Sequence, residues 1–197
     1  MSDAGEVLFG RADLERAFTA LGKRLAARGV VADVFVVGGA AMALAYDATR
    51  VTRDVDAVFV PHGVVLEEAR QVAAELGLPH WWLNEQGSVY ISGKDDVGKR
   101  RVFDHPGLRV MAASPEHVFA MKALAARARD IDDLILLANL MGIDSTEAAL
   151  QLCLDFYPDE PVPPRSEAVL RELFTAASEP RGNRADPRSE RGRDLRP

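Results

Sequence analysis

The chain has 197 residues, 48% of them hydrophobic and 27% charged, which is the ordinary balance of a globular protein. This length suits one domain with room for a small appendage, and the composition excludes global disorder and a collagen-like repeat. A net charge of −6 argues against coating nucleic acid through a bulk positive field, although it is compatible with a local basic groove.

The first half of the chain alternates helical and strand patterns. Apolar residues at spacings of three and four predict an amphipathic helix over 11–28, and Gly29 stands at its expected C-cap. Runs of β-branched residues between glycines or before proline predict the strands. The expected elements are a helix over 11–28, a strand over 30–37, a helix over 40–48, a strand over 52–60 and a helix over 64–76.

The second half begins with short β-like pieces around 88–91, 101–103 and 108–111 and then becomes helical. Ser114-Pro115-Glu116 is a strong helix start, with a capping hydroxyl, a proline in the first turn and an acid near the positive end of the dipole. No glycine or proline follows until Gly142, which predicts one long helix or two in close succession. Further helices are expected over 146–156 and 167–176.

This order of elements predicts an α/β (α+β) protein, a small mixed sheet followed by a helical C-terminal part. The expected divisions are an α/β core over 1–112, helices packed on it over 113–178, and a disordered tail over 179–197, where apolar residues are almost absent.

The expected location is the cytoplasm. The single cysteine, Cys153, excludes an intramolecular disulfide, is typical of a reducing compartment, and is expected to be buried. The N-terminal residues are polar and acidic, unlike a secretory signal. The longest uncharged run, 34–46, is shorter than the roughly 18 residues of a membrane span.

The pattern Asp54-Val55-Asp56 is the first candidate for chemistry. Side chains alternate along a strand, so both carboxylates and Thr52 would share one face, with the two acids about 7 Å apart. Such a pair can hold a divalent cation through hard oxygen ligands, and Mg²⁺ can bridge nucleotide phosphates. The alternative is a solvated strand edge or a cap.

Gly38-Gly39 stands at a strand-to-helix turn, where missing side chains let backbone N–H groups approach an anion. Arg50 and Arg53 flank the acids and could steady phosphate oxygens. A glycine pair alone is commonly just a tight turn, but the combination with the carboxylates favours a functional interpretation.

Gly38-Gly39 followed by Arg50-Val51-Thr52-Arg53-Asp54-Val55-Asp56 resembles the signature of the polymerase-beta-type nucleotidyltransferase fold. Within that fold, the chain is most similar to the AbiEii-like toxins and their MenT relatives. Those families carry a lysine and an Arg-Asp-x-x-Asp pattern on a C-terminal helix, which appear here as Lys122 and residues 129–133. The resemblance covers about residues 30–140.

The resemblance implies transfer of a nucleoside monophosphate from an NTP to the 3′ end of tRNA, which blocks aminoacylation and translation, and neutralisation by a cognate antitoxin. It implies that Asp54 and Asp56 hold Mg²⁺. It also implies that the triphosphate is bound by Gly38, Gly39, Thr52, Arg53 and Lys122. Asp133 or Asp130 would orient Lys122 or help to activate the acceptor hydroxyl.

Many members of the superfamily place a third carboxylate on a later central strand. Residues 108–111 contain no acid. Asp104 stands at a strand end, and the sequence does not determine toward which face of the sheet its side chain points. The general base is therefore left open, although the toxin branch often lacks this acid too.

On one continuous helix, Lys122, Arg129 and Asp133 would share a face at roughly 100° per residue. The opposite face would then form a core stripe, consisting of Leu124, Ile131, Ile135 and Ala138. The alternative is a solvated face carrying an Arg129–Asp133 pair.

A basic cluster is the candidate RNA-contacting loop, with a plain solvated loop as the alternative; its members are Lys94, Lys99, Arg100 and Arg101. Trp81 and Trp82 are expected in the core or at a partner contact, with base stacking as the alternative. The four histidines show no metal-ligand spacing.

Two other functions are compatible with the sequence. One is a nucleotidyltransferase that acts on a protein or a small molecule. The other is a catalytically idle domain that binds a nucleotide or a partner.

Overall fold

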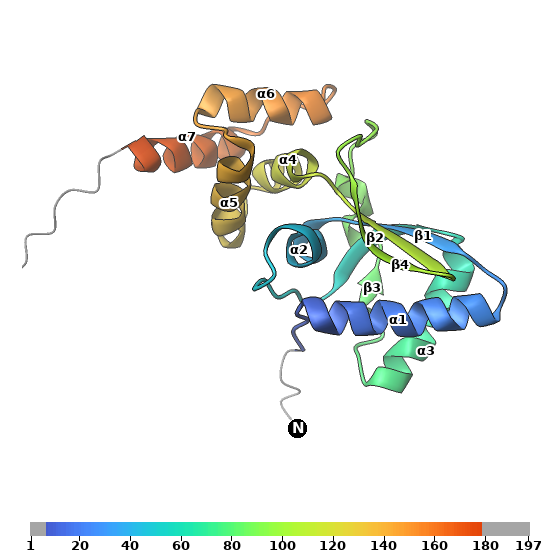
Figure 1. Ribbon diagram of the computed structural model, residues 1–197. Helices are drawn as coiled ribbons and strands as arrows, with labels where there is room; N and C mark the ends of the chain where they lie inside the picture. The colour runs from blue at the N-terminus through green and yellow to red at the C-terminus, as the bar shows by residue number, and fades with distance from the viewer. Residues whose placement is uncertain (1–6, 179–197) are drawn as a thin grey trace, which may run out of the picture.

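The computed structural model describes residues 7–178 and contains a five-stranded mixed sheet with helices around it, which confirms the expected fold class (Figure 1). The strands are β1 Ala32–Val36, β2 Val55–Val60, β3 Leu83–Asn84, β4 Arg100–His105 and β5 Leu108–Ala112. The longer helices are α1 Arg11–Ala27, α3 His62–Leu76, α4 Pro115–Ala125, α5 Ile131–Met141, α6 Thr146–Phe156 and α7 Pro164–Ser178. The shorter ones are α2 Gly38–Ala41, η1 Met42–Tyr46, η2 Gln86–Tyr90 and η3 Ala128–Asp130.

The sheet order is β3-β2-β1-β5-β4. β1 runs antiparallel to β2 and parallel to β5, β2 runs parallel to β3, and β4 pairs antiparallel with β5. The end of β1, the start of β2 and the end of β5 therefore meet at one edge of the sheet. The chain leaves this edge into α2 after β1 and into α4 after β5, so both helices start beside the first residues of β2.

Helix α1 packs against the sheet and against α3, as its apolar spacing predicts. Its buried face carries Leu14, Phe18 and Leu21. Arg24 and Arg28 then tie it to the buried Glu68 of α3, at N–O distances of 2.7 and 2.8 Å. Arg24 also pairs with Glu75 and Arg28 with Glu67, so an apolar face and these ion pairs hold the two helices together.

Several predicted boundaries change in the structure. The strands expected over 30–37 and 52–60 are shorter, as β1 and β2, and the helix over 40–48 is a short α2 that widens into the π-helix η1. The prediction of a β-like piece around 88–91 was wrong. Residues 86–90 form the short helix η2 instead, with local backbone hydrogen bonds from Ser88 N to Glu85 O (3.0 Å) and from Ile91 N to Ser88 O (3.1 Å). Strand β3 was not foreseen.

The helical run after Ser114 divides into two helices. Ser114 caps α4 by accepting a hydrogen bond from the N–H of His117, at 3.1 Å. Ala126 then adopts a left-handed conformation, with φ of 47°, and ends the helix. The predicted apolar stripe was wrong at Ile131 and Ile135, which are 39% and 44% exposed because this break reorients α5. Ala138 is buried as predicted, and Leu134 and Leu137 are buried beside it.

Figure 1 shows α4 to α7 gathered on one side of the sheet. Helix α6 coincides with the expected 146–156, and α7 begins three residues earlier than expected. Cys153 is buried as predicted, and burial raises the pKa of its thiol to about 12. Among the helices of the described residues, none is long and apolar enough to cross a membrane. The tail expected to be disordered, 179–197, lies outside the described residues.

Candidate active site

Two carboxylates stand at the beginning of β2. Asp56 belongs to the strand, whereas Asp54 precedes it by one residue, so only part of the Asp-x-Asp pattern has strand geometry. Asn84 donates a hydrogen bond from Nδ2 to Oδ2 of Asp54 (2.9 Å), and the N–H of Gly87 donates to Oδ1 of Asp56 (3.0 Å). Each carboxylate is thus held through one oxygen, and both line one cleft.

The pKa of Asp56 is raised above its usual value. Burial is the main cause, and the charge of Asp54 adds to it, while the Gly87 N–H and the guanidinium groups of Arg127 and Arg129 act in the opposite direction. Two nearby carboxylates in a half-buried position make the ionised pair unfavourable without a cation. The arrangement therefore favours binding of a positive charge.

The glycine turn packs directly against this pair. Gly38 has φ of +60°, which a residue with a side chain rarely adopts, and a Cβ on Gly39 would lie 2.6 Å from Oγ1 of Thr52. The same hydroxyl donates to the backbone oxygen of Asp54 at 3.0 Å. Gly39, Thr52 and Asp54 thus form one tightly packed unit, as the sequence motif suggests.

Lys122 lies on the opposite side of the cleft and is only 8% exposed. Its ammonium group lies 2.6 Å from Oδ1 of Asp130 and 2.8 Å from Oδ2 of Asp133. Asp133 also pairs with Arg50, at 3.0 Å. Both carboxylates are buried, so their charges are compensated within this network.

The sequence grouped Lys122 with Asp133 on one face of a continuous helix, and that geometry was wrong. Lys122 belongs to α4, Asp130 ends η3 and Asp133 belongs to α5. The turn at Ala126 brings these elements together, and Asp133 faces Lys122 and Arg50.

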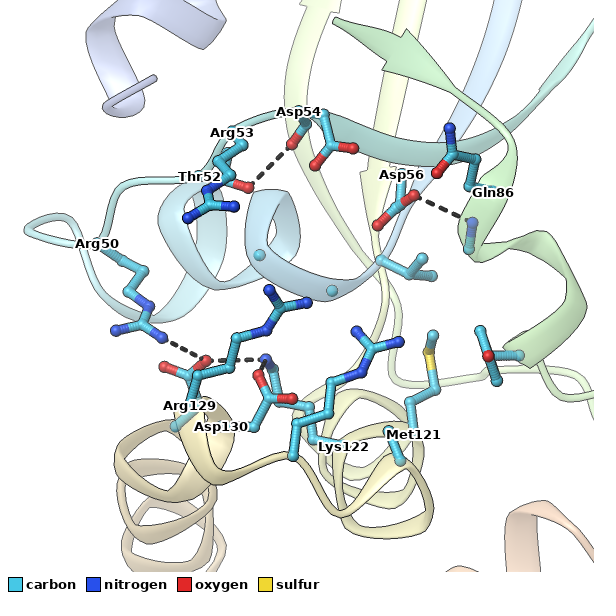
Figure 2. A pocket seen from close by; sticks show the side chains of 18 of the residues that line it. Arg50, Thr52, Arg53, Asp54, Asp56, Gln86, Met121, Lys122, Arg129 and Asp130 are labelled. Carbon is cyan, nitrogen blue, oxygen red and sulfur yellow. Dashed lines mark hydrogen bonds and ion pairs between the residues drawn. The ribbon is translucent and has the colours of Figure 1, made fainter. Parts of the chain in front are cut away.

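Figure 2 shows the two sides of the cleft, with Asp54 and Asp56 opposite Lys122, Arg129 and Asp130. The volume is about 610 Å³, within the range of small-molecule sites. All of the predicted catalytic and NTP-binding residues line it, namely Gly38, Gly39, Thr52, Arg53, Asp54, Asp56, Lys122, Asp130 and Asp133. Arg50, Arg127 and Arg129 add positive charge, which suits a phosphorylated ligand.

The predicted RNA-contacting cluster does not line this cleft, as far as the described residues show. Lys94 donates to the backbone oxygen of Asp155, Lys99 pairs with Asp95, and Arg100 lies over the ring of Tyr46. Arg101 pairs with Asp104, which is likewise absent from the cleft lining.

Within residues 7–178, no group of three or more His, Cys, Asp or Glu side chains could hold a metal ion. The carboxylate pair still fits Mg²⁺, because this ion commonly takes one or two carboxylates and completes its shell with water and substrate phosphates. Asp54 and Asp56 are hard oxygen donors that line one cleft, and the charge of Asp54 adds to burial in raising the pKa of Asp56.

The predicted site residues did not include Asn84, Gly87, Tyr90 or Arg127. Gly87, Tyr90 and Arg127 line the cleft, and Asn84 bonds to the cleft residue Asp54. Asn84 ends a strand of two residues, too short to give an alternating pattern, and Gly87 acts through its backbone. The only sequence signal at this place was the glycine itself. Gly87 packs so closely against Asp56 that a Cβ on it would lie 2.8 Å from the Cβ of Asp56. Of the tryptophans, Trp82 is in the core and Trp81 lines the cleft.

The sheet order, the carboxylate pair and the buried lysine together suit the class of enzymes that act on nucleotide phosphates. The chain belongs to the family described as "Nucleotidyltransferase of unknown function (DUF6036)", which matches residues 13–146. This match includes both sides of the cleft and confirms the nucleotidyltransferase assignment. No curated protein and no solved structure matched the chain. The narrower toxin resemblance stays a prediction.

Proposed function

We propose that this nucleotidyltransferase moves a nucleoside monophosphate from an NTP to an acceptor hydroxyl. The acceptor oxygen bonds to the α-phosphorus, the bond to the bridging oxygen breaks, pyrophosphate leaves, and the hydroxyl proton is released to a base or to water. The observation that carries this proposal is the single cleft in which Asp54 and Asp56 face Lys122 and several guanidinium groups.

The proposed roles follow from these positions. Asp54 and Asp56 would hold Mg²⁺, which, when bound, would neutralise charge on the triphosphate during transfer. The glycine turn offers backbone N–H groups without side-chain obstruction, and Thr52 and Arg53 stand beside it. These groups would position the triphosphate opposite the lysine.

Lys122 would neutralise negative charge on the phosphates. Asp130 and Asp133 hold its ammonium group at 2.6 and 2.8 Å, so orienting the lysine is the role that the contacts support. Because Asp133 also holds Arg50, one carboxylate positions two cations. Help from Asp130 or Asp133 in activating the acceptor hydroxyl remains part of the proposal.

The proposed acceptor is the 3′ end of tRNA, which makes the protein a translation-blocking toxin with a cognate antitoxin. The support is the sequence similarity of residues 30–140 to the AbiEii and MenT groups, together with the positive charge of the cleft. The basic cluster from Lys94 to Arg101 would contact RNA only outside the cleft.

The test is incubation of the purified protein with Mg²⁺, total tRNA and each α-labelled NTP in turn. We expect label on tRNA, reduced about 100-fold or more in Asp54→Ala, since removing a charge-stabilising group commonly costs that much. Asp95→Asn is the matched control, because Asp95 is an exposed carboxylate that does not line the cleft.

Each other outcome contradicts a different part of the proposal. Label on a protein or a small molecule instead of tRNA keeps nucleotidyl transfer and rejects the acceptor. Absence of label on tRNA, protein and small-molecule acceptors, from a folded protein with Mg²⁺ present, rejects transfer and supports an idle binding domain.

A further inference from the structure

Tyr90 is a large aromatic side chain that the fold leaves 49% exposed in the cleft. It ends η2, the five-residue helix whose Gly87 N–H bonds to Asp56. Its backbone oxygen accepts a hydrogen bond from the buried hydroxyl of Tyr157, at 2.6 Å. The backbone of Tyr90 is therefore fixed from the core while its ring faces the ligand space.

Arg127 comes to this ring from the other side of the cleft. It lies in the connection between α4 and η3, directly after the left-handed Ala126. Its guanidinium carbon is 6.0 Å from the centroid of the Tyr90 ring, at the outer limit of a cation–π contact. Within residues 7–178, no carboxylate lies within ion-pair distance of Arg127, so its planar group remains available to a ligand.

An aromatic ring and a guanidinium plane, such as those of Tyr90 and Arg127, are the groups on which a single base stacks in proteins. Such stacking is tolerant of base identity. The site also lies beside the carboxylates, since Tyr90 and Arg127 line the same cleft as Asp56 and Gly87, which bonds to Asp56, is three residues from Tyr90.

We propose that Tyr90 and Arg127 bind the nucleobase of the NTP by stacking. The inference rests on the proposed function, because it takes the NTP as the ligand of this cleft. Trp81 is a second exposed ring in the cleft, but the Tyr90 ring alone faces a guanidinium group there among the described residues. The NTP base is favoured over an acceptor base because Tyr90 shares its short helix with the group that holds Asp56.

The experiment compares binding of Mg²⁺ complexes of the NTPs with binding of inorganic tripolyphosphate, by calorimetry and without acceptor. Tripolyphosphate offers the phosphates but no base. We expect Tyr90→Ala to weaken NTP binding by about 5- to 100-fold and to leave tripolyphosphate binding unchanged. Tyr90→Phe and Tyr90→Trp keep a ring and are expected to bind NTPs within about twofold of the wild type.

Two further variants separate stacking from charge and from folding. Arg127→Lys keeps the charge but loses the plane, so it should weaken NTP binding more than tripolyphosphate binding. Val89→Ala is the control for η2, because Val89 is an exposed residue of the same helix that does not line the cleft. It should change neither affinity.

Equal losses of NTP and tripolyphosphate affinity in Tyr90→Ala would overturn the inference, since the ring would then act only through the fold. Unchanged NTP affinity would also overturn it, including the case in which only the KM of the acceptor rises. The proposed function fails separately: a wild-type protein that binds NTPs through Tyr90 but labels no acceptor supports the stacking site and rejects transfer.

Discussion

At the residue scale, ligand binding and stability oppose each other at Asp56. Burial and the charge of Asp54 raise the pKa of this carboxyl. A carboxyl whose pKa is higher in the folded than in the unfolded protein binds its proton more tightly when folded. Its ionisation therefore lowers the free energy of unfolding once the pH exceeds the unfolded pKa, and the full cost is present above the folded pKa.

We therefore expect Asp56→Asn to abolish nucleotidyl transfer and to stabilise the metal-free protein. The amide oxygen can still accept the Gly87 N–H, while the repulsion from Asp54 disappears. The gain at neutral pH should be at most about 1 kcal/mol, because solvent screens this half-buried site. Thermal unfolding over a pH series measures it, and the gain should shrink as the pH falls through the folded pKa of Asp56.

The same series with Mg²⁺ tests the proposed metal site. Ligands that bind only the folded state raise its melting temperature, so Mg²⁺ should stabilise the wild type and not Asp56→Asn. Transfer activity should decline on acidification, because protons and Mg²⁺ compete for Asp56 and a protonated Asp56 cannot hold the ion. Equal stabilisation of both proteins by Mg²⁺ would reject Asp56 as a ligand.

At the element scale, the glycine turn after β1 fixes the start of β2. A methyl group on Gly39 would lie 2.6 Å from Oγ1 of Thr52 and would displace that hydroxyl from the backbone oxygen of Asp54. We expect Gly39→Ala to cost about 1–3 kcal/mol of stability and to lower kcat/KM by about tenfold or more.

Unfolding and transfer assays measure both effects, with Gly63→Ala as the control. A Cβ on Gly63 of α3 would meet nothing within 4 Å. That substitution should leave transfer unchanged and stability unchanged or slightly higher. A Gly39→Ala protein with wild-type activity would show that Thr52 need not hold Asp54 for the reaction.

The elements also show what the sequence could and could not predict. Gly38, Asp54 and Lys122 were identified because each belongs to a recognisable motif, and the structure places them around one cleft. The helical geometry for Asp133 was wrong because the break is made by Ala126, an alanine in a left-handed conformation, which no composition rule signals.

At the scale of the whole molecule, the order of elements was predictable and their tertiary pairing was not. The alternation of periodicities gave the mixed sheet followed by helices. The positions of Tyr90 and Arg127 depend on long-range contacts, such as the bond from Tyr157 to Tyr90. Tyr90 and Tyr157 are 67 positions apart, and no local sequence pattern predicts a contact over that separation.

Two hydroxyl groups, one at the end of α6 and one in α7, bond to elements that line the cleft. The hydroxyl of Tyr157, at the end of α6, bonds to the backbone oxygen of Tyr90 at 2.6 Å, and that of Ser166, in α7, bonds to the backbone oxygen of Leu124 at 3.1 Å. Both donors are buried, and both bonds join the C-terminal helices to elements that line the cleft. Only the first holds the proposed base-binding residue.

This difference gives a matched pair of variants. Tyr157→Phe and Ser166→Ala each remove one hydroxyl–carbonyl bond, so each should lower stability by about 1 kcal/mol in chemical denaturation. We expect only Tyr157→Phe to raise the KM for NTP, by a few-fold, because it frees the backbone beneath the Tyr90 ring. The KM for the acceptor should stay constant in both. Equal effects on the KM for NTP would mean that the C-terminal helices support the cleft as a whole rather than through Tyr90.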